Sequence, residues 1–360
     1  MTRRSLAGAV ITWQRQHGRH GLPWQGTRDP YRVWLSEVML QQTQVGTVLD
    51  YYARFLARFP DVQTLAAAPL DDVLALWSGL GYYSRARNLH RCARAVVAEH
   101  GGQFPGSSAV LATLPGIGRS TAAAIAAFCF GERAAILDGN VKRVLTRALG
   151  FAGDLSSSSE EKRLWAEAEA LLPAGDVDIY TQGLMDLGAT VCSTRQPACL
   201  LCPLASVCVA CAAGTPERFP VKTKRVKRGR RQHALLWLRR GEQLLLQQRP
   251  EKGVWAGLWS LPEFESAQVL QERVATWPGQ GEWLPVIEHA LTHFVWTLQP
   301  LVWTLPARAA LPAGLPGAVR EAGEGLETGD GEERGQGRWV SEDAALAMGL
   351  PAPIRRLLER

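Results

Sequence analysis

Four cysteines that lie close together constrain the fold of this chain more than any other feature of its sequence. Cys192, Cys199, Cys202 and Cys208 follow the pattern Cys-x6-Cys-x2-Cys-x5-Cys. Thiolates so closely spaced can hold one tetrahedral zinc ion or an iron–sulfur cluster, and spacing alone does not separate the two. Zinc ribbons usually pair two Cys-x2-Cys units, whereas this chain has one, so we favour one [4Fe–4S] cluster. Cys211 is a rival for the fourth position, in which we place Cys208.

The other cysteines and the start of the chain give no sign of export. The seven cysteines are clustered and odd in number, which argues for a metal site rather than disulfides. Cys92 and Cys129 stand alone in helical patterns, so we expect both to be buried as small apolar residues. The apolar run after Arg4 stops at Trp13 without a cleavage site, and no segment is long enough to cross a membrane. We therefore expect a cytoplasmic protein.

Length and charge set the broad class. A chain of 360 residues exceeds what one hydrophobic core ordinarily serves, so we expect two domains. The 40 Lys plus Arg against 34 Asp plus Glu give a formal net charge of +6. That charge suits a polyanionic partner, but it is also common among enzymes and does not name a function.

Residues 1–212 follow the period of α-helices, which predicts a mostly helical first domain. Asp29 and Pro30 stand where a helix is expected to begin, and Gly101 and Gly131 stand where two are expected to end. The predicted helices are Ser5–His17, Tyr31–Phe59, Leu70–Leu80, Arg85–His100 and Ser120–Phe130.

The helical period fails over residues 213–232, which we interpret as a linker between domains. Within it, Lys222–Arg231 carries seven basic residues and no acid. Such a run is solvated, and we expect it also to contact phosphate, because it gives affinity for a polyanion without sequence preference.

Residues 233–360 mix strand and helix patterns and predict a smaller α+β domain. Between Pro306 and Gly337 a stretch rich in Gly, Ala, Pro and Glu has no period, and we expect a long mobile loop there. The predicted strands are Ala234–Arg239, Gln243–Gln248 and Phe294–Trp303, and the predicted helices are Ala267–Thr276 and Pro353–Glu359.

A glycine-containing turn joins two helical segments near the middle of the first domain. Residues 114–120, LPGIGRS, contain Gly116 and Gly118, which let backbone N–H groups approach a phosphate at the start of the next helix. With its flanking helices this is the helix-hairpin-helix pattern. Asp138 follows between the apolar pair Ile136-Leu137 and a new helix, a place where an Asp is usually an N-cap.

The hairpin, the Asp after it and the four-cysteine loop together resemble the helix-hairpin-helix DNA glycosylase superfamily. Three further segments narrow the likeness to its MutY-like adenine DNA glycosylases: VWLSEVMLQQTQV at residues 33–45, WSGLGYYSRARN at 77–88 and MDLGATVC at 185–192. The resemblance runs from about residue 13 to 208 and continues more loosely to the C-terminus. It implies a helical glycosylase domain with a [4Fe–4S] loop over residues 1–212 and a Nudix-like domain over 233–360.

Removing adenine leaves charge on both the base and the sugar, and two carboxyl groups can address both, as in glycoside hydrolysis. The resemblance assigns proton donation to adenine to Glu37 and stabilisation of the sugar cation to Asp138, with Asn140 positioning it. A Glu on an apolar helix face should have a raised pKa, as an acid working near neutrality requires. Without the resemblance, the alternative for Glu37 is a buried, hydrogen-bonded Glu, which we rank below the acid, and the alternative for Asp138 is a simple N-cap.

Strand cleavage is not expected. The superfamily's strand-cutting members carry a Schiff-base lysine just after the hairpin glycines, where this chain has Ser120. Lys142 lies near Asp138 in sequence but matches a family lysine outside that position. We therefore expect base removal with little cleavage of the strand.

Reaching a base inside a duplex requires flipping it out of the stack. By resemblance, the residues that contact DNA are Gln42, Tyr82, Gly116, Gly118, Ser120 and Lys142, with Gln42 and Tyr82 filling the vacated space. By resemblance, the adenine pocket corresponds to Trp24, Leu40, Val45 and Gln182, although the sequence alone favours ordinary core packing for the apolar members.

In the Nudix-like domain, Thr292 and His293 match a loop that recognises 8-oxoguanine, although the Phe of the family pattern is replaced by Leu291. No closely spaced acidic series of the kind that holds Mg²⁺ appears after residues 253–259, so we expect recognition rather than hydrolysis. The expected partner is double-stranded DNA with adenine opposite 8-oxoguanine or guanine, bound by a monomer at the nucleoid. A pyrimidine-specific relative and a non-catalytic cluster protein that binds DNA are the alternatives.

Overall fold

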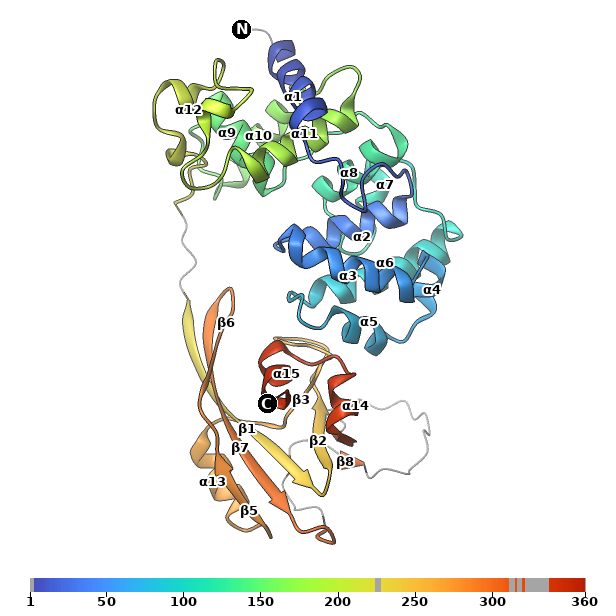
Figure 1. Cartoon of the computed structure of the whole chain (residues 1–360), viewed down its shortest axis with the longest axis vertical. Helices are drawn as coiled ribbons and strands as arrows, with labels where there is room; N and C mark the ends of the chain where they lie inside the picture. Colours follow the sequence, from blue (N-terminus) through green and yellow to red (C-terminus); the bar gives the residue numbers. More distant parts are fainter. Residues whose placement is uncertain (1–2, 224–227, 311–314, 316–318, 321–336, 360) are drawn as a thin grey trace. The chain divides into compact units, whose positions relative to one another are not determined.

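The computed structural model describes the chain except for residues 1–2, 224–227, 311–314, 316–318, 321–336 and 360 (Figure 1). Its contacts divide it into a helical unit, Met1–Ala67 with Asn88–Arg225, and a C-terminal unit, Ala68–Arg87 with Val226–Arg360. Part of the predicted basic run and most of the predicted mobile loop lie outside the described residues. None of the described helices is long and apolar enough to cross a membrane.

Helices make up nearly all of the regular structure in the helical unit (Figure 1). Most of α6 belongs to this unit, and two single turns, η1 (Cys199–Leu201) and η2 (Pro216–Arg218), accompany the cysteine loop and the segment after it. The helices are α1 (Arg3–His17), α2 (Pro30–Leu40), α3 (Val45–Arg58), α4 (Val62–Ala67), α6 (Ser84–His100), α7 (Ser108–Leu111), α8 (Arg119–Phe130), α9 (Gly139–Leu149), α10 (Ser158–Ala170), α11 (Val177–Thr190) and α12 (Val209–Ala212).

The single helix predicted over Tyr31–Phe59 is wrong, because the chain breaks into α2 and α3. At the break, Gln42 takes a left-handed conformation with φ of 60°. The apolar pattern continues across the break because both helices bury one face, so periodicity alone could not reveal it. The predicted start is correct: Pro30 opens α2, and the Asp29 carboxylate accepts from the backbone N–H of Tyr31 at 2.9 Å.

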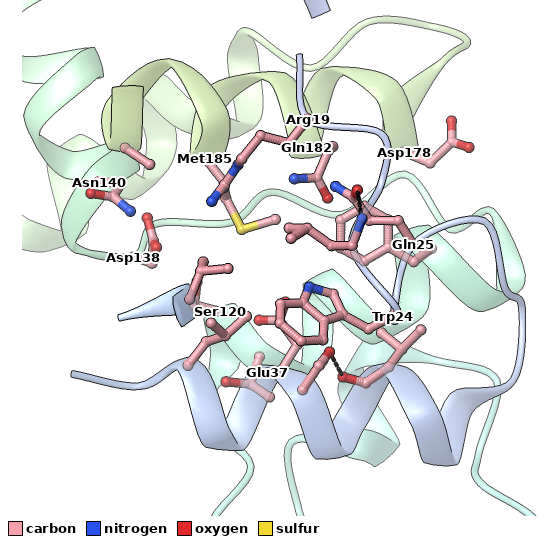
Figure 2. A pocket seen from close by; sticks show the side chains of 18 of the residues that line it. Arg19, Trp24, Gln25, Glu37, Ser120, Asp138, Asn140, Asp178, Gln182 and Met185 are labelled. Carbon is pink, nitrogen blue, oxygen red and sulfur yellow. Dashed lines mark hydrogen bonds between the residues drawn. The ribbon is translucent and has the colours of Figure 1, made fainter. Parts of the chain in front are cut away.

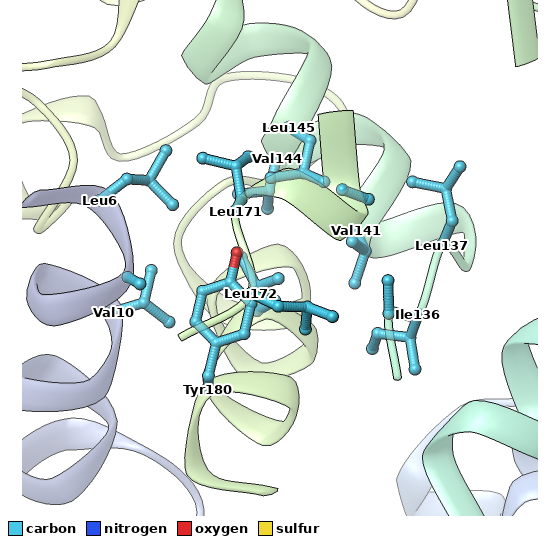
Figure 3. Packing of buried hydrophobic residues seen from close by; sticks show 14 of the residues in the cluster. Leu6, Val10, Ile136, Leu137, Val141, Val144, Leu145, Leu171, Leu172 and Tyr180 are labelled. Carbon is cyan, nitrogen blue, oxygen red and sulfur yellow. The ribbon is translucent and has the colours of Figure 1, made fainter. Parts of the chain in front are cut away.

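One apolar core holds the helices that carry the second half of the functional site. Figure 3 shows Leu6 and Val10 of α1 facing Val144 of α9 and Tyr180 of α11. Burying such side chains contributes roughly 1.5–3 kcal/mol each. The start of α9, where Asp138 lies, is therefore fixed by packing along the rest of that helix.

The C-terminal unit is built around one mixed sheet with the order β5-β7-β1-β2-β9-β8. Its longest pairing joins β1 and β7 in parallel along their whole length, and α13 packs Leu270 and Val274 into the core of the sheet. The elements are α5 (Leu70–Trp77), β1 (Gly229–Arg240), β2 (Gln243–Gln248), β3 (Trp259–Ser260), β4 (Glu263–Phe264), α13 (Ala267–Val274), β5 (Gln280–Trp283), β6 (Ile287–Ala290), β7 (Phe294–Leu305), β8 (Val319–Arg320), β9 (Gly337–Ser341), α14 (Glu342–Leu346) and α15 (Ala352–Leu358).

Two boundaries differ from the sequence prediction. Strand β1 begins at Gly229, five residues before the predicted Ala234, so the end of the predicted linker is strand. The reason is its pairing with β7, where Gly229 lies opposite Phe294, a partner that local sequence does not reveal. A short strand, β8, also lies inside the stretch predicted to be a loop and pairs with β9.

Residues 68–87 pack with the C-terminal unit although they precede it by more than a hundred residues of chain. The Tyr83 hydroxyl donates to the carbonyl of Leu350 at 2.8 Å, and the Arg87 guanidinium donates to that of Ala256 at 2.7 Å. Nothing in the sequence pattern indicated this association, because the segment continues the helical period of its neighbours.

Candidate active site

A cavity of about 1470 Å³ opens in the helical unit between α2, the starts of α8 and α9, and α11 (Figure 2). It brings together residues that lie far apart in sequence. The predicted site residues that line it are Trp24, Glu37, Leu40, Gln42, Val45, Ser120, Asp138, Asn140 and Gln182.

Glu37 lies on α2 at the base of this cavity, between the buried residues Ser36 and Val38 (Figure 2). Burial, which disfavours the charged form, raises the pKa of Glu37 to about 8, and the negative charge of Asp138 raises it further. At neutral pH Glu37 is therefore mostly protonated, and it can donate a proton.

Asp138 lies across the cavity at the start of α9, as its N-cap, and its Oδ1 accepts from the backbone N–H of Val141 at 2.7 Å. Burial raises its pKa as well, but the backbone N–H groups of Val141 and Asn140 and the cations Arg143 and Lys142 oppose that rise. The cap role and a place in the cavity thus coincide. The two carboxyl groups differ because only Asp138 receives donors that favour a negative charge.

Ser120, at the start of α8, holds the segment before Asp138. Its hydroxyl accepts from the backbone N–H of Leu137 at 3.1 Å, so the hairpin helix and the Asp138 loop are joined directly. Lys142 does not line the cavity and instead pairs with Glu161 of α10.

Arg143 connects the cavity to the cysteine loop, and sequence reasoning gave it no role. Its Nη2 donates to Asn140 Oδ1 at 2.9 Å and to the carbonyl of Gly188 at 2.6 Å, while its Nε donates to the carbonyl of Cys192 at 2.7 Å. With Oδ1 engaged, Asn140 keeps its amide N–H groups for the cavity. The only sequence signal for this role of Arg143 was its spacing from Asn140, one turn along α9.

Polar groups also line the side of the cavity that faces Trp24. Gln182 donates from Nε2 to the carboxylate of Asp186 at 2.8 Å, and Asp186 is fully buried on α11. The same carboxylate accepts from the backbone N–H and the Nε of Arg19, at 2.9 and 2.6 Å. Neither Arg19 nor Asp186 was predicted, because their partners lie more than 160 residues apart in the chain.

The hairpin has the geometry that its sequence predicted. Gly116 has φ of 76°, and a Cβ there would lie 2.5 Å from Cβ of Asn88, so only glycine fits. Gly118 is the N-cap of α8 in an extended conformation, and both glycines are exposed. Neither glycine is among the residues that line the cavity, and a helix start of this kind can offer its backbone N–H groups to an anion.

The predicted cysteine ligands line a second, smaller cavity together with Cys211 and Arg147. Arg147 is almost fully buried, and it donates to the carbonyls of Ser193 and Thr194 at 2.6 and 3.0 Å and to Cys192 Sγ at 3.3 Å. Within the described part of the chain, no three His, Cys, Asp or Glu side chains are arranged to hold one metal ion. Cys92 and Cys129 are buried, as predicted.

Comparison with known proteins places the chain in a family. Residues 35–169 match the HhH-GPD superfamily of base excision DNA repair proteins, and residues 233–360 match the NUDIX domain. The chain is 36% identical to the adenine DNA glycosylase of Buchnera aphidicola subsp. Baizongia pistaciae (strain Bp), over 98% of this chain and 95% of the relative. The chain belongs to the adenine DNA glycosylase family.

Other relatives agree with this membership. The human adenine DNA glycosylase is 34% identical, over 87% of this chain and 69% of the human protein. A solved thermostable thymine-DNA glycosylase is 30% identical with a TM-score of 0.53, over 59% of this chain and 97% of that one. The predicted helical glycosylase domain and the Nudix-like domain are thereby confirmed, and the chain is a DNA glycosylase of base excision repair.

In this adenine DNA glycosylase the remaining predicted DNA contacts lie in the C-terminal unit. Tyr82 is exposed and has a φ of 50° in the turn before α6. Thr292 and His293 are exposed in the turn between β6 and β7. Strand β7 also carries Trp296, whose ring stacks on that of Trp255 with centroids 4.6 Å apart. Sequence reasoning missed this aromatic pair, because Trp255 lies in a segment noted only for the acids it lacks.

Proposed function

We propose that this chain removes adenine paired with 8-oxoguanine or guanine by acid-assisted hydrolysis of the N-glycosidic bond, without cutting the strand. The observation that carries the proposal is the pair Glu37 and Asp138, which face one cavity. Burial raises the pKa of both carboxyl groups, but only Asp138 receives backbone N–H donors and nearby cations that oppose the rise.

Glu37 acts as the acid. With a pKa of about 8 it holds a proton at neutral pH, and that proton goes to N7 of the flipped adenine, which then leaves as a neutral base. The Glu37 carboxylate that results accepts a proton from the attacking water. Net, water adds to the sugar carbon, the C–N bond breaks and adenine departs.

Asp138 stabilises the cation that develops on the sugar. The backbone N–H groups at the start of α9, with Arg143 and Lys142 beyond them, favour its carboxylate form. Asn140, anchored by Arg143, positions Asp138 and the sugar from the same helix start. Electrostatic stabilisation of this kind works best in a site from which the flipped base excludes water.

Strand cleavage would need an amine in the cavity, and neither Ser120 nor Lys142 provides one there. Ser120 has a hydroxyl instead of an amine, and this hydroxyl accepts from the backbone N–H of Leu137. Lys142 is paired with Glu161. Gln42, in the strained turn after α2, and Tyr82 are proposed to fill the space left by the flipped base.

The cysteine loop fits a [4Fe–4S] cluster held by Cys192, Cys199, Cys202 and Cys208. These four thiols line one cavity together with Cys211 and Arg147. The buried Arg147 has no carboxylate partner in the described ranges, and an anionic cluster would supply the missing negative charge. When bound, the cluster cross-links the loop that receives Arg143 at the carbonyl of Cys192.

Recognition of 8-oxoguanine is assigned to the turn that carries Thr292 and His293. A hydroxyl and an imidazole at an exposed hairpin tip can pair with the carbonyl and N–H groups that distinguish the oxidised base. The turn is held by a hydrogen bond of 2.9 Å from the backbone N–H of Gly229 to the carbonyl of His293.

The test uses single-turnover excision on duplexes with adenine opposite 8-oxoguanine, opposite guanine and opposite thymine, each divided into samples with and without alkali. Strand breaks that appear only after alkali, and fastest opposite 8-oxoguanine, are expected. Breaks without alkali would contradict simple hydrolysis, and equal rates opposite all three bases would contradict the role of the C-terminal turn. Glu37→Gln is the matched inactive control.

A further inference from the structure

We propose that Asp186, buried on α11 behind the cavity wall, is a positioning residue for Gln182. It fixes the amide of Gln182 so that Oε1 of Gln182 faces the base, and this orientation sets the preference for the amino group of adenine. The inference rests on adenine being the base removed. It concerns a residue that never touches the base itself.

The orientation follows from the hydrogen bond between the two side chains. Gln182 Nε2 lies 2.8 Å from Asp186 Oδ1, and a carboxylate can only accept, so the nitrogen of the amide must face Asp186. The carbonyl oxygen of Gln182 is thereby left for the cavity that Gln182 lines (Figure 2). An amide without such a partner could turn over and present its N–H groups instead.

Asp186 is itself held in place by charge. It is fully buried, and the Arg19 guanidinium and backbone N–H occupy both of its oxygens, at 2.6 and 2.9 Å. A buried, paired carboxylate is costly to move or to leave without partners. The orientation of Gln182 is therefore set before any base enters, as a preorganised site requires.

This orientation has a chemical consequence for base choice. Adenine carries a donor at position 6, the N6 amino group, whereas guanine and hypoxanthine carry a carbonyl there. An acceptor at the cavity wall pairs with the amino group of adenine and repels the carbonyl of guanine or hypoxanthine. The same fold serves a thymine-DNA glycosylase, so the fold alone does not fix which base is removed.

The test compares the rates at which adenine and hypoxanthine are removed opposite guanine, under single-turnover conditions. Asp186→Asn keeps the shape but allows the amide to turn over, and it should lower the adenine-to-hypoxanthine ratio at least about tenfold, which corresponds to 1.36 kcal/mol. Thr190→Ala, which removes a hydroxyl bonded only to the Asp186 carbonyl on the exposed side of α11, should leave the ratio unchanged.

A second variant separates orientation from folding. The double variant combines Asp186→Asn with Gln182→Glu. The carboxylate that Gln182→Glu introduces can only accept hydrogen bonds, so it presents an acceptor to the base in either orientation, and the amide that Asp186→Asn introduces can donate to it. The ratio of adenine to hypoxanthine removal should therefore return to that of the wild type. If the double variant folds but does not discriminate, or if Asp186→Asn slows both bases equally, the positioning role is wrong. A wild-type chain that removes no adenine would instead overturn the activity on which the inference rests.

Discussion

Replacing Glu37 by glutamine should stabilise the folded chain at neutral pH while removing its activity. The pKa of Glu37 is raised from 4.5 to about 8, so the folded state binds its proton more tightly than the unfolded state does. The stability that depends on this proton is complete below pH 4.5, decreases as the pH rises and is lost above pH 8. Each unit between the two pKa values is worth 1.36 kcal/mol, so at pH 7 the wild type has lost about 3 kcal/mol.

Glutamine keeps the shape of the side chain but carries no charge to bury. The free energy of unfolding, measured by urea denaturation from pH 4 to pH 9, should therefore be about equal for both chains near pH 4 and higher for Glu37→Gln at pH 7 by roughly 3 kcal/mol. Glu99→Gln, an exposed substitution with the same charge change, is the control and should show no such trend. The reasoning is refuted if the difference between Glu37→Gln and wild type does not depend on pH, or if the variant is the less stable of the two at pH 7.

Three other changes test separate parts of the site. Arg143→Lys cannot bridge Asn140 and the cysteine loop at once, so the excision rate should fall about tenfold to a hundredfold while duplex affinity, measured by fluorescence anisotropy, changes little; a weakened affinity with an intact rate would point instead to a DNA contact. Gly116→Ala meets a neighbour at 2.5 Å in a left-handed conformation and should lower unfolding stability by about 1–3 kcal/mol, whereas Gly118→Ala has open space and should not. Arg147→Met should lower iron and sulfide content in purified protein, and full occupancy would contradict its pairing with an anionic cluster.

Features encoded within a few residues were predictable from the sequence. The cap at Asp138 and the hairpin glycines follow from local geometry, and the structure places them as expected. The four cysteines line one cavity, and the cluster that their spacing predicts stays a prediction. Glu37 could be placed on an apolar helix face, but that it shares a cavity with Asp138 depends on packing between α2 and the rest of the unit.

Features that depend on distant partners were not predictable. Asp186 looked like one more polar residue of a helix, because the Arg19 that pairs with it lies 167 positions away. The break at Gln42 was hidden because the apolar pattern continues through it. The early start of β1 was hidden because a run of arginines forms strand only when β7 is beside it.

Residues 68–87 leave the ribosome long before the C-terminal residues against which they pack. Leu74 and Trp77 of α5 are fully buried, yet Tyr83 beside them bonds to a carbonyl 267 residues later in the chain. At typical rates of synthesis that partner appears on the order of ten to fifty seconds after the segment itself. During that interval α5 lacks its cover, so a nascent or prematurely terminated chain displays apolar side chains that chaperones and proteases can bind.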